Sequence, residues 1–227
     1  MLPLHLLLHE RALKRVESIM RILIADDHAI VRRGLKDILL ETFPSADIDE
    51  VGDAEGLIEK VTKEEWHVIL TDLSMPGRSG MEALQYIQQN FPKIPVLILS
   101  VHPEEQYAIR ALKNGAAGYL NKDMATDELV NAVQRVLSGK KYITASVAEK
   151  LASSFNTDSA KPSHEYLSDR EFEVLKLLAA GKSVSEIAAM FHLSVTTIST
   201  YRARVLVKMN MKTNAELTQY AIEHHLI

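Results

Sequence analysis

The chain of 227 residues contains no cysteine, which excludes a disulfide framework and thiolate chemistry. Its formal net charge is only −4, so the total charge indicates no particular partner. No apolar run approaches the roughly 18 residues that a spanning helix needs, and we expect no membrane segment. The absence of cysteine fits a reducing cytosol, and we expect a cytoplasmic protein. With 47% hydrophobic and 25% charged residues, the chain can form two small globular domains.

Residues 1–19 resemble a signal peptide only superficially. The segment has no basic start and no cleavage site of small residues, and its short apolar stretch is broken by His5. We interpret it as an N-terminal extension, because Met20 is a natural first residue for the domain that follows. His5 and His9 are four residues apart and could bind a metal ion, although two surface histidines are the more ordinary explanation.

Short apolar runs alternate with longer amphipathic stretches in residues 20–143. Runs rich in Leu, Ile and Val are typical of strands buried on both faces, and they occupy residues 21–26, 68–72 and 96–100. Weaker strand candidates lie near residues 46–52 and 117–120. Helical patterns occupy about residues 28–42, 53–64, 80–91, 104–114 and 126–138. Five strands alternating with five helices predict an α/β domain with a doubly wound, five-stranded parallel sheet in the order 2-1-3-4-5.

The pattern changes after residue 143. Residues 144–164 are rich in Ser, Asn, Asp and Pro and predict a linker, in which ASVAEKLASSF could add a helix. Residues 165–227 predict a small all-α domain of four helices, whose start signals are Ser168, Ser183, Ser194 and Thr213. The second and third of these helices are separated by the short turn HLS, which is typical of a helix-turn-helix.

Side chains suited to chemistry follow the predicted strands, and these are Asp26, Asp27, Asp72, Ser100 and Lys122. Because the carboxyl ends of parallel strands share one edge of a sheet, we expect these side chains to lie together. Three neighbouring carboxylates repel one another, and a divalent cation relieves this repulsion; hard oxygen ligands favour Mg²⁺. The turn at Met-Pro-Gly would bring the backbone carbonyl of Ser74 to the same ion.

These groups suit phosphoryl transfer. An aspartate can attack phosphorus and form an aspartyl phosphate. The phosphoryl group in transfer carries negative charge on three oxygens, which Mg²⁺, the ammonium of Lys122 and the hydroxyl of Ser100 could each stabilise. An aspartyl-phosphate hydrolase is an alternative, but it would need a second aspartate two residues after the nucleophile. Position 74 is serine, which argues against an enzyme.

Taken together, the motifs resemble a known family. IADDH, LTDLSMPGRSG, LILSVH and GAAGYLNKD resemble, in order and spacing, the motifs of a response-regulator receiver domain. LSDREFEVLKLLAAGKSVSEIA and LSVTTISTYRARVLVKM resemble a LuxR-type helix-turn-helix domain. The pairing is that of the NarL/FixJ subfamily of two-component response regulators, and the resemblance covers all of the chain except the extension and the linker.

The resemblance implies a transcription regulator rather than an enzyme. Asp72 would accept a phosphoryl group from a histidine kinase, Lys122 would pair with that group, and Ser100 and Tyr119 would move as switch residues. The implied ligands of Mg²⁺ are Asp26, Asp27, Asp72 and the carbonyl of Ser74. In this family a free receiver often blocks the output domain, so we expect contact between the domains before phosphorylation. A regulator that binds DNA without phosphorylation remains an alternative, which the intact acidic set disfavours.

The third helix of the second domain is the candidate recognition helix. Its stretch from Val195 to Asn210 carries three basic residues and no acid, which favours a polyanionic partner. With Ile198 toward the core, the opposite face would enter the major groove of double-stranded DNA. The candidate DNA contacts are Thr196, Thr197, Ser199, Thr200, Tyr201, Ala203, Arg204 and Lys208. The resemblance also implies that the last helix forms a homodimer on activation. We assign no function to His102, His192, His224 or His225.

Overall fold

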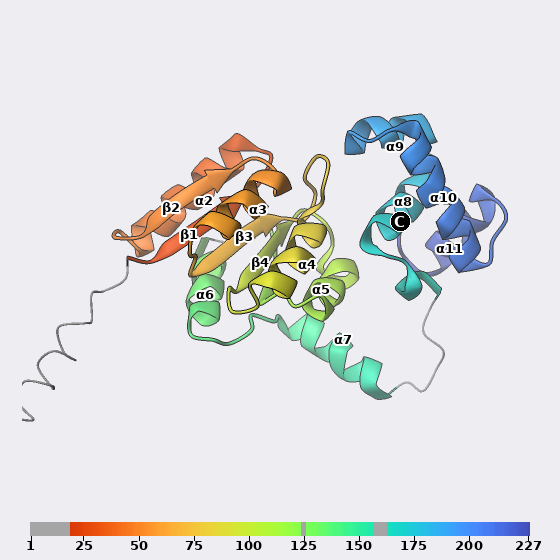
Figure 1. The fold of residues 1–227 in the computed structure, drawn as a ribbon. Helices are drawn as coiled ribbons and strands as arrows, with labels where there is room; N and C mark the ends of the chain where they lie inside the picture. Colours follow the sequence, from red (N-terminus) through yellow and green to blue (C-terminus); the bar gives the residue numbers. More distant parts are fainter. Residues whose placement is uncertain (1–18, 124–125, 157–162) are drawn as a thin grey trace, which may run out of the picture.

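The computed structural model describes residues 19–123, 126–156 and 163–227 and consists of an α/β domain followed by an all-α domain (Figure 1). The rest of the N-terminal extension, including His5 and His9, lies outside the described residues. None of the helices in the described ranges combines the length and the apolar character that crossing a bilayer requires.

The first domain is built on five parallel strands. They are β1 (Arg21–Ala25), β2 (Asp47–Val51), β3 (Val68–Asp72), β4 (Val96–Ser100) and β5 (Gly118–Asn121). Their order is β2-β1-β3-β4-β5, which confirms the predicted sheet. Every residue of β3 and β4 is buried, because helices cover both faces of the sheet. This explains the apolar runs VIL and VLIL with which the two strands begin.

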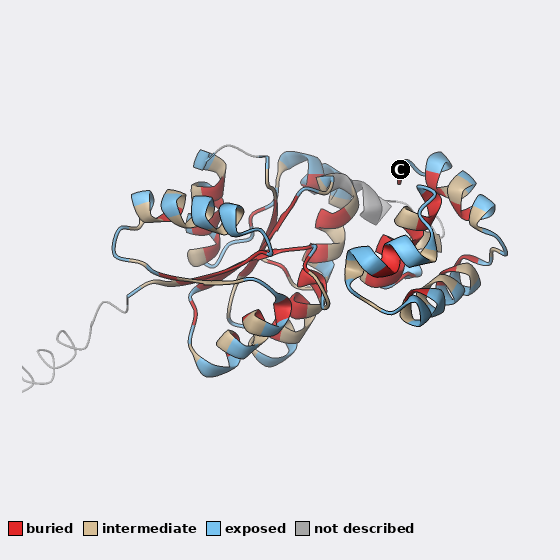
Figure 2. Cartoon of the chain, turned by 90° about the horizontal axis from the view of Figure 1, so that it is seen from above, coloured by how far each residue is buried: buried red, intermediate tan, exposed pale blue. Residues whose placement is uncertain are grey.

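Helices lie on both faces of this sheet, with their buried sides turned inward (Figure 2). The helices of the first domain are α2 (Ala29–Thr42), α3 (Ala54–Lys63), α4 (Gly80–Asn90), α5 (Glu104–Lys113) and α6 (Thr126–Leu137). Ile22 and Ile24 of β1 share a hydrophobic cluster with residues of α2 and α6. Leu23, between them, points to the other face and belongs to the cluster of α3, α4 and α5. The alternation along β1 therefore divides the core into two layers.

A helix occupies the first half of the expected linker. Helix α7 (Ala145–Asn156) follows the α/β domain, and the short 3-10 helix η1 (Ser163–Tyr166) precedes the second domain. Val147 of α7 is only 2% exposed, so this helix is packed against the first domain rather than free in solvent.

The second domain contains α8 (Asp169–Ala179), α9 (Val184–Phe191), α10 (Val195–Met209) and α11 (Asn214–Glu223). Capping boxes begin α8, α9 and α11, and the side chain of Ser194 accepts the amide of Thr197 at the start of α10. Ile198, Val205 and Met209 of α10 are buried, so this helix packs on the core through the face that the sequence predicts. The four predicted helices are therefore confirmed.

Candidate functional site

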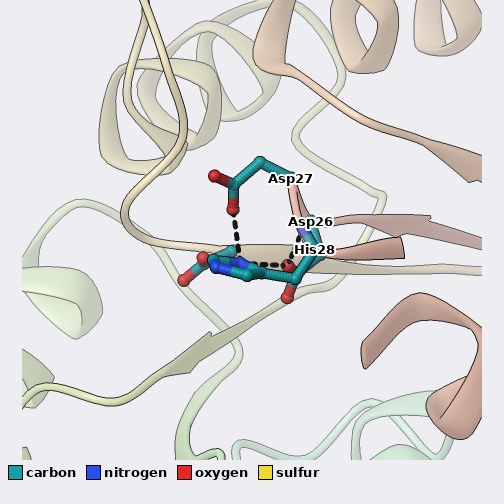
Figure 3. A group of neighbouring side chains, drawn as sticks. Asp26, Asp27 and His28 are labelled. Carbon is teal, nitrogen blue, oxygen red and sulfur yellow. Dashed lines mark hydrogen bonds and ion pairs between the residues drawn. The ribbon is translucent and has the colours of Figure 1, made fainter. Parts of the chain in front are cut away.

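An acidic pocket lies where β1 and β3 end. One ligand atom from each of Asp26, Asp27, His28 and Asp72 lies within 4.8 Å of the others. Figure 3 shows the side chains of Asp26, Asp27 and His28 turned toward one another. The ammonium nitrogen of Lys122 is 2.6 Å from Asp26 Oδ2 and 2.8 Å from Asp72 Oδ2. The structure thus brings three carboxylates and one ammonium group to a single edge of the sheet.

The parallel sheet explains this convergence. Asp72 is the last residue of β3, and Asp26 directly follows β1, where its amide donates to the carbonyl of Val51 in β2. The amide of Lys122 donates to the carbonyl of Ser100 at the end of β4, which fixes Lys122 beside the same edge. Neighbouring strands in register thereby place residues far apart in sequence beside one another.

Burial makes the charges in the pocket interact strongly. Asp26 and Asp72 are 1% and 3% exposed, whereas Asp27 lies at the exposed rim. Burial and the neighbouring Asp26 raise the pKa of Asp72, although Lys122 opposes this shift. Burial lowers the pKa of Lys122, but its bonds to Asp26 and Asp72 outweigh that effect and raise it. The ammonium of Lys122 is therefore firmly protonated.

The donor set of this pocket suits a hard divalent cation. The three carboxylates of Asp26, Asp27 and Asp72 carry more negative charge than the single ammonium of Lys122 can balance, and one oxygen from each lies within 4.8 Å of the others. A divalent cation would balance the remaining negative charge. The pocket is therefore consistent with a metal site.

The predicted switch residues lie around His102, in the loop between β4 and α5. The amide of His102 donates to Ser100 Oγ over 3.1 Å. The hydroxyl of Tyr119 donates to the backbone carbonyl of His102 over 2.9 Å. Ser100 is fully buried and Tyr119 is 2% exposed, so the tyrosine ring already lies inside the domain. The His102 ring nitrogen Nε2 lies 2.9 Å from Ser74 Oγ. Ser74 and Ser100 are therefore joined through this one residue.

Sequence reasoning assigned no function to two histidines at the pocket. His28 Nδ1 lies 2.8 Å from Asp27 Oδ1, and the position of His28 directly after two strand-end aspartates could have indicated this contact. His102 had no comparable signal, because its contact with Ser74 depends on the conformation of two loops. Burial, followed by the charges of Lys176 and Lys122, lowers the pKa of His102.

Gly80 fixes the position of Asp72. A Cβ atom at Gly80 would lie 1.8 Å from the carbonyl oxygen of Asp72, so no other residue fits without displacing the backbone. We expect Gly80→Ala to lower the free energy of unfolding by about 2 kcal/mol or more in chemical denaturation. Gly34→Ala in α2 is the matched control, because a Cβ there meets no atom within 4 Å. It should raise stability by about 0.5–1 kcal/mol. Equal effects of the two substitutions would contradict this close approach.

The candidate DNA contacts on α10 fall into two groups. Six are exposed, namely Thr196, Ser199, Thr200, Ala203, Arg204 and Lys208, whereas Thr197 and Tyr201 are partly buried. Lys208 is also paired with Glu171 of α8, with its ammonium 2.6 Å from the carboxylate. Arg202 donates to the side chain of Asn214 at the start of α11. Two of the three basic residues therefore have intramolecular partners, and the cationic stripe is weaker than the sequence alone indicates.

Comparisons with protein families agree with this architecture. The model described as "Response regulator receiver domain" matches residues 22–134. The model described as "Bacterial regulatory proteins, luxR family" matches residues 165–221.

Two curated relatives match over nearly their whole length. The oxygen regulatory protein NreC of Staphylococcus carnosus is 35% identical over 215 residues, which cover 92% of this chain and 99% of that protein. The response regulator UvrY of Escherichia coli is 33% identical over 206 residues, which cover 90% and 94% of the two chains.

Among solved structures, RcsB of Salmonella typhimurium is similar in fold. One RcsB structure is 28% identical to this chain with a TM-score of 0.64, and the match covers 90% of this chain and 98% of RcsB. Another RcsB structure, bound to a promoter in the presence of the phosphomimetic BeF3−, is 30% identical to this chain with a TM-score of 0.58. The match covers 88% of this chain and 98% of RcsB.

Proposed function

Because the chain belongs to the two-component response regulators that join a receiver domain to a LuxR-type DNA-binding domain, the NarL/FixJ family, we propose that Asp72 is its phosphoacceptor. The chain is a regulator of transcription and not an enzyme. The observation that carries the proposal is the position of the Lys122 ammonium, which bridges Asp26 and Asp72 inside the acidic pocket. We divide the chain into an extension (1–19), a receiver (20–143), a linker (144–164) and a DNA-binding domain (165–227).

The phosphodonor is a histidine kinase that carries a phosphohistidine. A carboxylate oxygen of Asp72 forms a bond to phosphorus while the bond between phosphorus and the histidine nitrogen breaks, and the imidazole leaves. Lys122 lies within reach of the new phosphoryl group, and Ser100 and Tyr119 respond to it through the loop that contains His102.

Mg²⁺ is the ion that suits this pocket. The carboxylates of Asp26, Asp27 and Asp72 would hold it, together with the backbone carbonyl of Ser74. When bound, it supplies positive charge that neutralises the phosphoryl oxygens. Lys122 supplies the second positive charge beside Asp72 and remains protonated.

Helix α10 is the DNA-reading element of this proposal. Its exposed face presents small polar side chains and Arg204, which suits contacts with the backbone and base edges of double-stranded DNA. Solved structures of RcsB include a complex with DNA and an arrangement of two dimers on two parallel DNAs. We propose that this chain likewise binds DNA as a homodimer, which forms through α11 on phosphorylation, and that it acts in the cytoplasm.

Incubation of the full chain with acetyl phosphate and Mg²⁺ tests the proposal. A stable covalent adduct on Asp72, located by peptide mass spectrometry, is the expected result. Rapid release of phosphate over many turnovers would indicate a hydrolase instead. No adduct would indicate a regulator that acts without phosphorylation.

Arg204 is expected to contact DNA through its charge. We expect Arg204→Ala to weaken binding to a duplex of random sequence and to reduce the slope of log K against log salt by about 0.9. Arg33→Ala in α2 is the control, since Arg33 is an exposed arginine of the receiver with a surface ion pair. Fluorescence anisotropy over a series of salt concentrations measures this slope. A slope in Arg204→Ala equal to that of the parent chain would contradict a phosphate contact.

A further inference from the structure

The acidic pocket also contains a nitrogen ligand, the imidazole of His28. Its Nδ1 lies 2.8 Å from Asp27 Oδ1 and 3.3 Å from Asp26 Oδ1. An oxygen of Asp72 completes the group, in which one ligand atom from each of the four residues lies within 4.8 Å of the others. Figure 3 shows the imidazole turned toward the two neighbouring carboxylates. The pocket therefore offers three oxygen ligands and one nitrogen ligand.

The fold does not require an imidazole at this position. His28 is the N-cap residue of α2, yet its side chain makes no capping hydrogen bond to that helix. The side chain is 64% exposed, so it contributes little to the core. Its backbone amide donates to Asp26 Oδ1 over 2.8 Å, and this bond does not depend on the side chain. The ring contacts that remain are those with the carboxylates of the pocket.

Asp26 gives independent support for an ion in this pocket. Its side chain is 1% exposed. Its Oδ2 forms an ion pair with the ammonium of Lys122 over 2.6 Å, but it accepts no hydrogen bond from the described residues. A buried carboxylate is costly unless it is hydrogen-bonded, paired or bound to a metal ion, and Lys122 is shared with Asp72. A cation beside Asp26 would therefore stabilise its charge.

The donor set favours an ion other than Mg²⁺. Mg²⁺ prefers oxygen ligands and keeps several waters, whereas imidazole suits borderline ions such as Zn²⁺. Zn²⁺ usually takes four ligands, and His, Asp and Glu are among those it accepts. Three carboxylates and one imidazole supply that number. With all four in place, no position would remain for a phosphoryl oxygen.

An ion has a route to this pocket, although the two domains touch beside it. A cavity of about 320 Å³ lies between the domains, with Asp27 and Ser74 on the receiver side. Lys176 and Phe191 of the DNA-binding domain line its other side. Asp27 and His28 are both exposed, so an ion can bind them first from solvent. Entry of an ion therefore needs no opening of the fold.

We propose that the acidic pocket also binds a borderline divalent ion such as Zn²⁺, with His28 as its nitrogen ligand, and that this ion excludes Mg²⁺ and blocks phosphorylation of Asp72. The second half of the inference rests on the proposed role of Asp72. The ion binds the lone pair of His28 Nδ1, and the ring hydrogen is then on Nε2. His28 thus makes phosphorylation of the receiver sensitive to a second metal.

Zinc K-edge X-ray absorption of the full chain with one equivalent of Zn²⁺ tests the nitrogen ligand directly. All proteins carry His5→Ala and His9→Ala, because that pair could bind Zn²⁺ by itself. We expect outer-shell scattering from one imidazole in this parent and its loss in His28→Ala. His67→Ala is the matched control, because His67 is also exposed but lies before the start of β3, at the opposite end from Asp72.

The affinities for the two ions provide a second measurement. Competition with a chromophoric chelator gives the affinity for Zn²⁺, and calorimetry gives that for Mg²⁺. His28→Ala should weaken binding of Zn²⁺ roughly tenfold or more, because it removes one ligand. The effect on Mg²⁺ should be smaller, because Mg²⁺ prefers oxygen, so the ratio of the two affinities should fall. His67→Ala should leave this ratio unchanged.

The initial rate at which acetyl phosphate and Mg²⁺ modify Asp72 tests the regulatory half. In this reaction a carboxylate oxygen bonds to phosphorus and acetate leaves. The rate of each variant with Zn²⁺ is compared with its own rate without Zn²⁺. Half-inhibition of His28→Ala should need roughly tenfold more free Zn²⁺ than half-inhibition of the parent. Additional Mg²⁺ should relieve the inhibition, since the two ions compete for the same carboxylates.

An unchanged imidazole signal or an unchanged affinity for Zn²⁺ in His28→Ala would overturn the site, even if Asp72 is phosphorylated as proposed. Zn²⁺ that binds through His28 but leaves the rate of adduct formation unchanged would overturn the regulatory half. No adduct in the parent with Mg²⁺ alone would instead reject the proposed function, and with it the regulatory half. The absorption and affinity measurements would still decide the ion site.

Discussion

Replacement of Asp72 by asparagine should lower the rate of adduct formation with acetyl phosphate and Mg²⁺ by roughly 100-fold or more. The neutral amide lacks the anionic carboxylate oxygen that attacks phosphorus, so no acyl phosphate can form at this position. The fold should remain intact, because the amide oxygen can still accept from Lys122 and the neutral side chain removes the repulsion that Asp72 experiences from Asp26. Intact-protein mass spectrometry over time measures the rate, and chemical denaturation checks stability.

The matched control for this prediction is Asp123→Asn. Asp123 directly follows Lys122 but is exposed, so its loss should leave the rate of adduct formation unchanged. An adduct that persists in the Asp72 variant, for example on Asp27 at the rim of the pocket, would reject Asp72 as the phosphoacceptor.

Replacement of Lys122 by methionine should lower the free energy of unfolding at pH 7 by about 3–5 kcal/mol in metal-free buffer. The substitution leaves two buried carboxylates, Asp26 and Asp72, without the ammonium that lies between them. Lys60→Met is the matched control. Lys60 lies 2.6 Å from Asp49, but both side chains are more than one third exposed, so we expect a loss below about 1 kcal/mol.

The stability of the Lys122 variant should also depend on pH and on Mg²⁺ differently from that of the parent chain. Without the lysine, the folded pair of carboxylates has a pKa above that of the unfolded chain, and the folded state binds more protons. The lost stability should therefore return as pH falls through that raised pKa, and it should be largest at neutral and higher pH. Mg²⁺ should restore stability at pH 7. A loss that grows toward acid pH, or one no larger than in Lys60→Met, would contradict this electrostatic account.

The sheet could be predicted from the sequence because burial on both faces leaves a direct signal. β3 and β4 are buried at every position, so their sequences contain uninterrupted apolar runs. The meeting of Asp26, Asp72 and Lys122 followed from the same argument, since parallel strands end at one edge. Helix starts were equally visible, because the capping serine and glutamate are only three residues apart.

Contacts between distant elements could not be predicted in this way. Arg170 and Glu173 are charged residues of the kind that usually lie on the solvent-exposed face of a helix. Their burial depends on packing between α8 and the receiver. Lys208 was expected to face DNA, but it also pairs with Glu171, which the sequence gives no reason to place beside it. The pattern of apolar and polar residues along an element indicates which of its faces is buried. It does not indicate which other element packs on that face.

The affinity of the full chain for DNA, measured before and after phosphorylation, tests the central claim most directly. A duplex selected in vitro with the phosphorylated chain serves as the ligand, and Asp72→Asn serves as the control. The account predicts that phosphorylation of the parent chain lowers the dissociation constant about tenfold or more, while the variant treated in the same way does not change. Equal dissociation constants for the parent with and without a verified phosphoryl group on Asp72 would contradict it.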